Sequence, residues 1–340
     1  MGGDFAPAHE VAGAIEALRL GKNGFEVILV GRQAEIEEQL KRHNSEGLRI
    51  SIVNADEVIT MDDPPTAALK QKKNSSLAVG MQLHKDGKAD AFCSVGNTGA
   101  VLSASTLILG RIKGVSRPTI AAFFPSEKGV CILVDAGTNV DCRAQHLYEF
   151  AVMGAMYSRK VFKHENPTVG LLNVGEEKKK GTEAVQEAYA LLERSTLNFI
   201  GNVEGRDILK GTSEVIVCDG FVGNVILKFG ESVPRFLKSK LKQYAAGNLF
   251  RTLLIGAARG SLRAALRDMD YEEFGGVPVL GVNGVSMIGH GSSSPKALRN
   301  MVLKAVEVAE SGLNKYIEEA MATSLRPAES TAAPAQKGIS

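Results

Sequence analysis

Four glycine-rich turns carry the residue types that can hold an anion. They read MGGDFAP at 1–7, SVGNTGA at 94–100, VDAGTN at 134–139 and CDGFVGN at 218–224. Glycine allows backbone N–H groups to approach a phosphate without a Cβ in the way, and each turn also contains Asp or Asn. A single turn of this kind usually only reverses the chain, but four together favour a phosphate-binding site.

The same turns lack the signatures of the common nucleotide sites. The chain has no GxxxxGK[ST] loop, and no GxGxxG follows a strand-like run, which argues against a P-loop NTPase and a standard dinucleotide site. We therefore expect a phosphate without a nucleotide. The residues expected to bind it are Asp4, Gly96, Asn97, Thr98, Gly99, Asp135, Asn139, Gly223 and, as a lone histidine in a Gly/Ser loop, His290.

Three consecutive lysines precede a predicted helix start in NVGEEKKKGTE, residues 173–183. A solvated charged loop would have the same composition. Lys180, however, is followed directly by Gly181 and Thr182, where the helix is expected to begin, and an ammonium group there can meet a phosphate. Asn224, in the fourth turn, could donate its side-chain amide to a carbonyl or phosphate oxygen.

The composition indicates a globular protein of the reducing cytoplasm. Of 340 residues, 44% are hydrophobic and the net charge is +2, which is too close to neutral to indicate nucleic-acid binding. The four cysteines lack CxxC spacing, so we expect neither disulfides nor a zinc site. No apolar run reaches the roughly 18 residues that a membrane span needs. We expect no metal and no cofactor.

Apolar runs alternate with amphipathic segments along most of the chain. Strands are predicted at 26–30, 49–53, 89–95, 119–124, 130–134, 168–172 and 214–217, and helices at 33–43, 75–85, 141–159 and 182–194. This alternation predicts an α/β fold: two-lobed, with a mostly parallel sheet and helices on both faces. Residues 1–320 are expected to form this unit, and 322–340, rich in Ala, Pro, Ser and Thr, a disordered tail.

One helical stretch, 235–267, contains eight basic residues and no acidic ones. A core or dimer-interface helix with basic flanks would fit this pattern. An anionic partner, either a membrane leaflet or an acidic carrier protein, fits it equally well. The residues expected to contact such a partner are Leu249, Phe250, Leu253, Leu254, Arg251, Arg259 and Arg263.

Seven motifs in order give the chain a specific resemblance. They are MGGDFAP, SVGNTGA, VDAGTN, NVGEEKKKGTE, GNVEGRDI at 201–208, CDGFVGNVILKF and GHGSSS. From residue 1 to about 318 the chain resembles the PlsX-type phosphate acyltransferase family of phospholipid synthesis. The resemblance implies that inorganic phosphate attacks a long-chain acyl-acyl carrier protein thioester, giving acyl phosphate. It also implies a fold similar to phosphotransacetylase and isopropylmalate-type dehydrogenases, and a homodimer.

The resemblance and the residues together suggest roles for the candidates. The 96–99 turn and Lys180 would hold the phosphate. Asn224, or the N–H groups of the 220–224 turn, would stabilise the oxyanion formed from the thioester. Lys180 and Asn224 are therefore the expected catalytic residues. The partners expected are acyl carrier protein, phosphate and the inner face of the membrane, to which the protein would bind peripherally.

Three other functions compete with this one. A phosphotransacetylase-like enzyme would use acyl-CoA in place of the carrier protein. An isopropylmalate-type dehydrogenase would need a carboxylate cluster for a metal ion, which we do not find in the sequence. A non-catalytic membrane-associated scaffold of the same fold would not need the intact glycine turns.

The start of the chain departs from the family pattern. Members of the family carry a few residues before MGGD that form a first strand, whereas Met1 here stands in the middle of that motif. We therefore expect the natural start to lie upstream of residue 1. Loss of a central strand would weaken the fold and the turn at residues 2–4.

Overall fold

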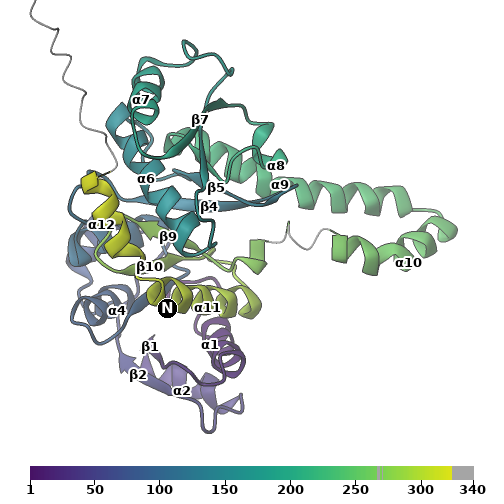
Figure 1. Ribbon diagram of the computed structural model, residues 1–340. Coiled ribbons are helices and arrows are strands. Elements are labelled where there is room, and N and C mark those ends of the chain that lie inside the picture. The colour runs from purple at the N-terminus through teal and green to yellow at the C-terminus, as the bar shows by residue number, and fades with distance from the viewer. Residues whose placement is uncertain (266–268, 270, 324–340) are drawn as a thin grey trace, which may run out of the picture.

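A sheet of eight strands forms the centre of the molecule in a computed structural model, which describes residues 1–265, 269 and 271–323 (Figure 1). Its strands lie in the order β3-β10-β9-β4-β5-β8-β6-β7. In that order they span Ala91–Ser94, Val285–Ile288, Val277–Leu280, Thr119–Ser126, Gly129–Val134, Val215–Val217, Thr168–Leu172 and Asn198–Val203. A separate sheet pairs β1, Val27–Gly31, with β2, Ile50–Asn54.

Five of the eight strand pairings among the described residues are parallel, so the prediction of a mostly parallel α/β fold is confirmed. The other three pairings are antiparallel and lie next to one another, at β10-β9, β9-β4 and β4-β5. Three successive reversals leave β5, β8, β6 and β7 running opposite to β3 and β10. The carboxyl ends of the two groups of parallel strands therefore lie on opposite sides of the sheet, at opposite ends of the strands.

Helices cover both faces of this sheet (Figure 1). They are α1 Ala8–Leu20, α2 Gln33–Lys41, α3 Pro65–Gln71, α4 Ser76–Lys85, α5 Thr98–Ala104, α6 Ala144–Lys160, α7 Glu183–Glu193, α8 Asp207–Lys210, α9 Gly220–Ala245, α10 Leu249–Ala265, α11 Pro295–Glu310 and α12 Leu313–Thr323. A π-helical turn, Ser105–Leu109, continues α5, and Tyr271–Glu273 form a short 3₁₀ turn.

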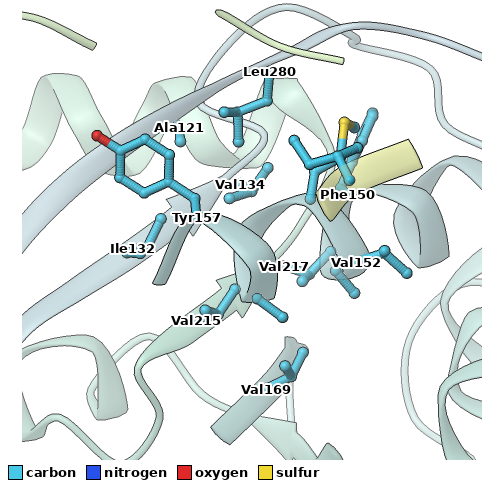
Figure 2. Close-up of a cluster of buried hydrophobic side chains, with 14 of the residues drawn as sticks. Ala121, Ile132, Val134, Phe150, Val152, Tyr157, Val169, Val215, Val217 and Leu280 are labelled. Carbon is cyan, nitrogen blue, oxygen red and sulfur yellow. The ribbon is translucent and has the colours of Figure 1, made fainter. Parts of the chain in front are cut away.

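The largest core lies between α6 and one face of the sheet. Figure 2 shows Phe150, Val152 and Tyr157 of α6 among the valines of the central strands. Phe150 and Tyr157 are fully buried, and burial of each such side chain contributes about 1.5–3 kcal/mol. On the opposite face, the first turns of α9 and the helix α5 pack on a second core, in which Phe124 of β4 lies against Gly230 of α9.

The second half of α9 leaves the body of the protein. Beyond Pro234 every residue of α9 except Ala245 is exposed, and α10 returns alongside it to form a helical hairpin that projects outward (Figure 1). The stretch predicted as basic and amphipathic is therefore this hairpin. The side chain of Arg263, residue 267 and the predicted tail from 324 on lie outside the described residues.

Candidate functional site

Three of the segments singled out in the sequence meet at the carboxyl ends of β3 and β10. The backbone N–H of Asp4 donates to the carbonyl of Gly291 at 2.9 Å. A Cβ on Gly2 would lie 3.5 Å from the Cα of Gly96. The first turn, the second turn and the His290 loop thus form one group, which we call the first cluster; it contains Asp4, Gly96, Asn97, Thr98, Gly99 and His290.

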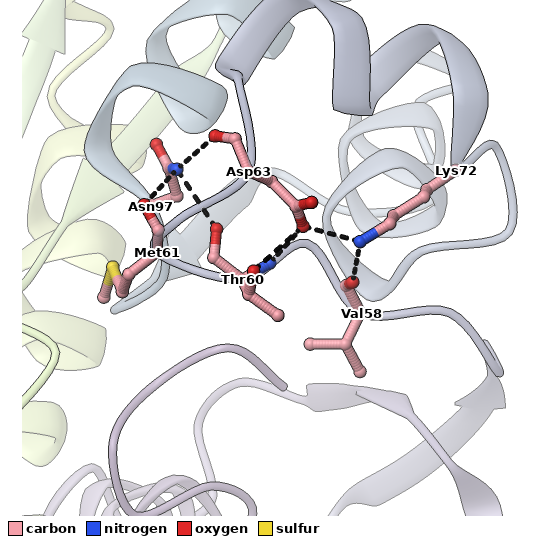
Figure 3. A network of polar contacts seen from close by, with 6 residues as sticks. All are labelled: Val58, Thr60, Met61, Asp63, Lys72 and Asn97. Carbon is pink, nitrogen blue, oxygen red and sulfur yellow. Dashed lines mark hydrogen bonds and ion pairs between the residues drawn. The ribbon is translucent and has the colours of Figure 1, made fainter.

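The side chain of Asn97 forms hydrogen bonds with backbone groups of the protein (Figure 3). Its Oδ1 accepts from the Ala100 N–H at 3.0 Å, so it caps the start of α5. Its Nδ2 donates to three carbonyls, those of Thr60, Met61 and Asp63, at 3.1, 3.2 and 3.1 Å. Asn97 therefore positions the turn, and the groups left to meet an anion are the N–H groups of Thr98 and Gly99 at the helix start.

The segment that Asn97 holds is itself fixed by a partly exposed ion pair. Lys72 Nζ lies 2.5 Å from Asp63 Oδ2 and 2.9 Å from the carbonyl of Val58. The hydrogen bond from Lys72, followed by that from the Thr60 N–H, lowers the pKa of the Asp63 carboxyl. Beside the turn, burial raises the pKa of the Cys93 thiol to about 12, so this cysteine is not a thiolate nucleophile at neutral pH.

We expect Asn97→Asp to lower the free energy of unfolding by about 1–3 kcal/mol, because aspartate keeps the cap but cannot donate to the three carbonyls. Urea unfolding measures this loss. Asn248→Asp is the matched control: Asn248 also caps a helix, accepting from the Arg251 N–H at 3.0 Å, and its change to aspartate keeps that bond. Equal losses in the two variants would contradict the role given to Asn97.

The third and fourth turns form a second cluster at the opposite edge of the sheet. The buried carboxylate of Asp135 accepts hydrogen bonds from the N–H groups of Gly137, Thr138 and Asn139 at 3.1, 3.0 and 2.6 Å. Asn139 Nδ2 donates both to this carboxylate, at 2.8 Å, and to the carbonyl of Pro118, at 2.9 Å. Asp135 and Asn139 therefore build the turn, and their side chains are not free to bind a ligand.

The start of α9 is pressed against this turn. A Cβ on Gly223 would lie 1.8 Å from the carbonyl oxygen of Asp135, a distance that no side chain can occupy. One residue later, Asn224 is exposed and lies over Gly137, within 3.1 Å of the point where a Cβ on Gly137 would stand. Among the described residues, no protein group hydrogen-bonds the Asn224 amide, which leaves it free for a substrate.

Lys180 lies in the loop after β6, which is the strand next to β8. Asn173 Nδ2 donates to the Lys180 carbonyl at 3.0 Å and holds the loop. With the described residues, the ammonium group makes one weak contact, 4.0 Å from Glu177 Oε1. Lys178 differs, since it forms an ion pair with Glu193 of α7 that raises its pKa. Because β6 and β8 are adjacent and parallel, Lys180 and Asn224 follow neighbouring carboxyl ends.

Helix α9 connects the two clusters. His290 Nε2 lies 3.6 Å from Glu231 Oε1 of α9, and Lys228 Nζ lies 3.0 Å from Glu231 Oε2. From Asn224 to Glu231 the helix rises about 10 Å, at roughly 1.5 Å per residue. The four turns therefore form two pairs, and each pair lies against α9. They do not all meet at the same end of the strands. Sequence patterns gave no signal for Glu231.

Among the described residues, no three His, Cys, Asp or Glu side chains come together in a way that could hold a metal ion.

Comparisons with known sequences agree on one family. The model of a family described as "Fatty acid synthesis protein" matches residues 1–316. A protein named phosphate acyltransferase from Chlorobaculum parvum is 47% identical over 327 residues, covering 93% of this chain and 96% of that protein. One of the same name from Desulforamulus reducens is 47% identical over 321 residues, with 94% and 95% covered.

Solved structures show the same fold at low identity. A phosphotransacetylase from Streptococcus pyogenes has a TM-score of 0.59 and 18% identity, covering 89% of this chain and 92% of that one. A 4-hydroxythreonine-4-phosphate dehydrogenase from Klebsiella pneumoniae has a TM-score of 0.51 and 11% identity, with 88% and 94% covered. The prediction of a fold shared by phosphotransacetylases and dehydrogenases is confirmed.

Proposed function

The chain belongs to the Fatty acid synthesis protein family and is a phosphate acyltransferase, and from this premise we propose that it transfers a long-chain acyl group from acyl carrier protein to inorganic phosphate. The observation that carries the proposal is the position of Lys180 and Asn224 after the carboxyl ends of two adjacent parallel strands. Within the described part of the chain, the ammonium is exposed and the amide has no protein hydrogen-bond partner. One suits a phosphate and the other a developing oxyanion.

The proposed reaction is a direct displacement at the thioester. A phosphate oxygen, held by the Lys180 ammonium, attacks the carbonyl carbon and forms a C–O bond. The carbonyl oxygen takes up negative charge in the tetrahedral intermediate, and the Asn224 amide donates a hydrogen bond to it. The C–S bond then breaks, and its electron pair leaves with the thiolate, whose pKa near 8.5 requires little help from an acid.

The 96–99 turn keeps its proposed role as an anion site through the N–H groups of Thr98 and Gly99. Its cluster meets α9 through His290, whose Nε2 lies 3.6 Å from Glu231 Oε1, about 10 Å along the helix from Asn224. A compact phosphate cannot contact both places at once, whereas an extended carrier-bound substrate can. We therefore propose that the substrate lies along the first three turns of α9.

An assay with two acyl donors tests this function. The protein is supplied with phosphate and either palmitoyl-acyl carrier protein or palmitoyl-CoA, and acyl phosphate is measured as the hydroxamate. We expect the carrier-bound donor to give the higher kcat/KM. A preference for palmitoyl-CoA would favour a phosphotransacetylase-like activity, and no acyl phosphate from either donor would favour a scaffold.

The α9–α10 hairpin is the surface that we propose for the partners. Leu249, Phe250, Leu253 and Leu254 are 55–77% exposed, and Arg251 stacks on Tyr244 at 4.6 Å. Arg259 is exposed on the same helix. The described helices include none that is long and apolar enough to cross a membrane. The apolar side chains suit a peripheral position on the inner membrane face, and the basic ones suit an acidic carrier protein.

We also propose that the protein is a homodimer, as the family resemblance implies. Size-exclusion chromatography with light scattering gives the mass in solution and decides between one chain and two.

We expect Leu254→Glu to lower binding to vesicles that contain anionic lipid by about tenfold or more, because a buried leucine contributes about 1.5–3 kcal/mol. Flotation with liposomes measures the bound fraction. Gln243→Glu, on the exposed second half of α9, adds the same charge without removing an apolar group. Unchanged binding in both variants would leave the carrier protein as the partner of the hairpin.

A further inference from the structure

The motif GNVEGRDI, at 201–208, contributes no residue to the reaction proposed above. It begins in β7, which pairs in parallel with β6. Asn202 of β7 lies opposite Leu171 of β6, and the N–H of Asn173 donates to the carbonyl of Val203 at 2.8 Å. The loop of residues 173–181, which we call the Lys180 loop, therefore starts directly beside Asn202.

The side chain of Asn202 reaches the Lys180 loop. Its Nδ2 donates to the carbonyl of Glu177 at 2.9 Å, and the backbone N–H of Lys180 donates to the same carbonyl at 3.1 Å. One carbonyl oxygen thus joins β7 to the turn that presents Lys180. Loss of the Asn202 amide would remove the bond that ties this turn to the sheet.

Two more amide side chains hold the loop from other directions. Asn173, directly after β6, donates to the carbonyl of Lys180 at 3.0 Å. Gln186 of α7 donates to the carbonyls of Lys179 and Gly181, at 3.0 and 3.1 Å. The backbone is therefore fixed on both sides of Lys180. A lysine stem is flexible, so a fixed backbone is needed to keep its ammonium in one place.

Asn202 is costly for stability in its position. It is 7% exposed, and its Oδ1 is buried with no hydrogen-bond partner among the described residues. A buried amide with one unsatisfied end destabilises a fold relative to an apolar side chain of similar size. Proteins retain such residues mainly at functional sites. The hydrogen bond from Asn202 to the Glu177 carbonyl indicates that this site is the Lys180 loop.

We propose that Asn202 and Gln186 are positioning residues of the acyl transfer, which act on the phosphate through Lys180. The inference rests on the proposed function, because it takes Lys180 as the group that holds the phosphate. Each amide fixes a carbonyl close to Lys180 in the chain. The lysine stem passes over Gly175, where a Cβ would lie 3.5 Å from Lys180 Cγ, and so has a defined direction. Displacement of such a group by about 1 Å can lower a rate about 10²-fold.

Initial rates at varied phosphate concentration test the proposal. Asn202→Ala and Gln186→Ala should each lower kcat/KM for phosphate by about tenfold or more and leave KM for the acyl donor within about twofold. In a chain that already carries Lys180→Ala, the same changes should alter kcat/KM by less than about twofold, because the group that they position is absent. Gln186 is exposed, so Gln186→Ala leaves the core intact and tests the proposal where Asn202→Ala fails to fold.

Asn198→Ala is the matched control. Asn198 also belongs to β7, and its Nδ2 donates to the carbonyl of Asn166 at 3.1 Å, at the end of the strand away from the Lys180 loop. This variant loses the same kind of bond and should keep kcat/KM within about twofold. Unchanged kcat/KM in Asn202→Ala and Gln186→Ala would overturn the proposal. Equal losses with and without Lys180 would also overturn it, because they would show a general effect on the fold.

Hydrogen exchange in residues 173–181 gives a second readout that needs no turnover. We expect exchange at least about fivefold faster in Asn202→Ala and Gln186→Ala, and unchanged exchange in Asn198→Ala. Unchanged exchange in the first two variants would overturn the proposal, because the amides would then not hold the loop. Absence of acyl phosphate with the unmodified chain would instead overturn the proposed function, and the exchange rates would still show whether the amides hold the loop.

Discussion

Lys180→Ala is expected to lower kcat/KM for phosphate by about 10²–10³-fold, the usual loss when one electrostatic group of a transition state is removed. Among the residues that the structure describes, the ammonium makes one weak contact, 4.0 Å from Glu177, and it is exposed. The free energy of unfolding should therefore change by less than about 0.5 kcal/mol. Initial rates at varied phosphate concentration, together with urea unfolding, separate the two effects.

The neighbouring lysine provides the matched control. Lys178 is exposed in the same loop, but its ammonium pairs with Glu193 and lies 5.3 Å from the ring of Tyr189. Lys178→Ala removes the same charge from the loop. It should leave kcat/KM within about twofold, because the Lys178 ammonium pairs with Glu193 of α7. Near-normal turnover of Lys180→Ala would remove Lys180 from the mechanism. Equal losses in both variants would indicate a general effect of loop charge.

Gly223→Ala should have the largest effect on stability of the substitutions considered, a loss of about 3 kcal/mol or more or a failure to fold. The added methyl group would stand 1.8 Å from the Asp135 carbonyl oxygen and 3.1 Å from Cys218 Sγ. Both neighbours are buried, and the Asp135 carbonyl belongs to a turn held by its own carboxylate. Helix α9 would have to move away, taking Asn224 from its place over Gly137.

Gly256→Ala in α10 makes the same chemical change at an open site. No atom lies within 4 Å of its Cβ position, so the variant should gain about 0.5–1 kcal/mol from helix propensity. Thermal unfolding of the two variants compares them directly. A Tm for Gly223→Ala within a degree or two of that of the unmodified protein would contradict the close approach of α9 to the turn at 134–139.

Most of the strands could be predicted from their apolar runs, but three could not. In β7 the run Asn198–Val203 is interrupted by Gly201 and carries asparagine at both ends of its apolar part. Pro278 lies inside β9, where the backbone cannot donate a ladder hydrogen bond, and β10 has only four residues. The last two join distant segments of the chain, and their pairing creates the reversal of strand direction. Local patterns carry no information about such contacts.

The candidate site could be predicted only in part for a related reason. A turn that binds an anion and a turn that stabilises itself use the same residue types, because Asp and Asn hydrogen-bond nearby backbone groups in both. Asp135, Asn139 and Asn97 turned out to serve the protein. In the described part of the chain, the side chains of Lys180 and Asn224 hydrogen-bond no backbone group. Only coordinates separate these two groups of residues.

One measurement tests the central claim most directly: acyl phosphate formed from palmitoyl-acyl carrier protein and inorganic phosphate, followed together with the release of carrier thiol. We expect one acyl phosphate for each thiol released, and a rate that falls about 10²–10³-fold in Lys180→Ala. Thiol release without acyl phosphate, or a product formed equally well by both chains, would contradict the proposed transfer to a phosphate held by Lys180.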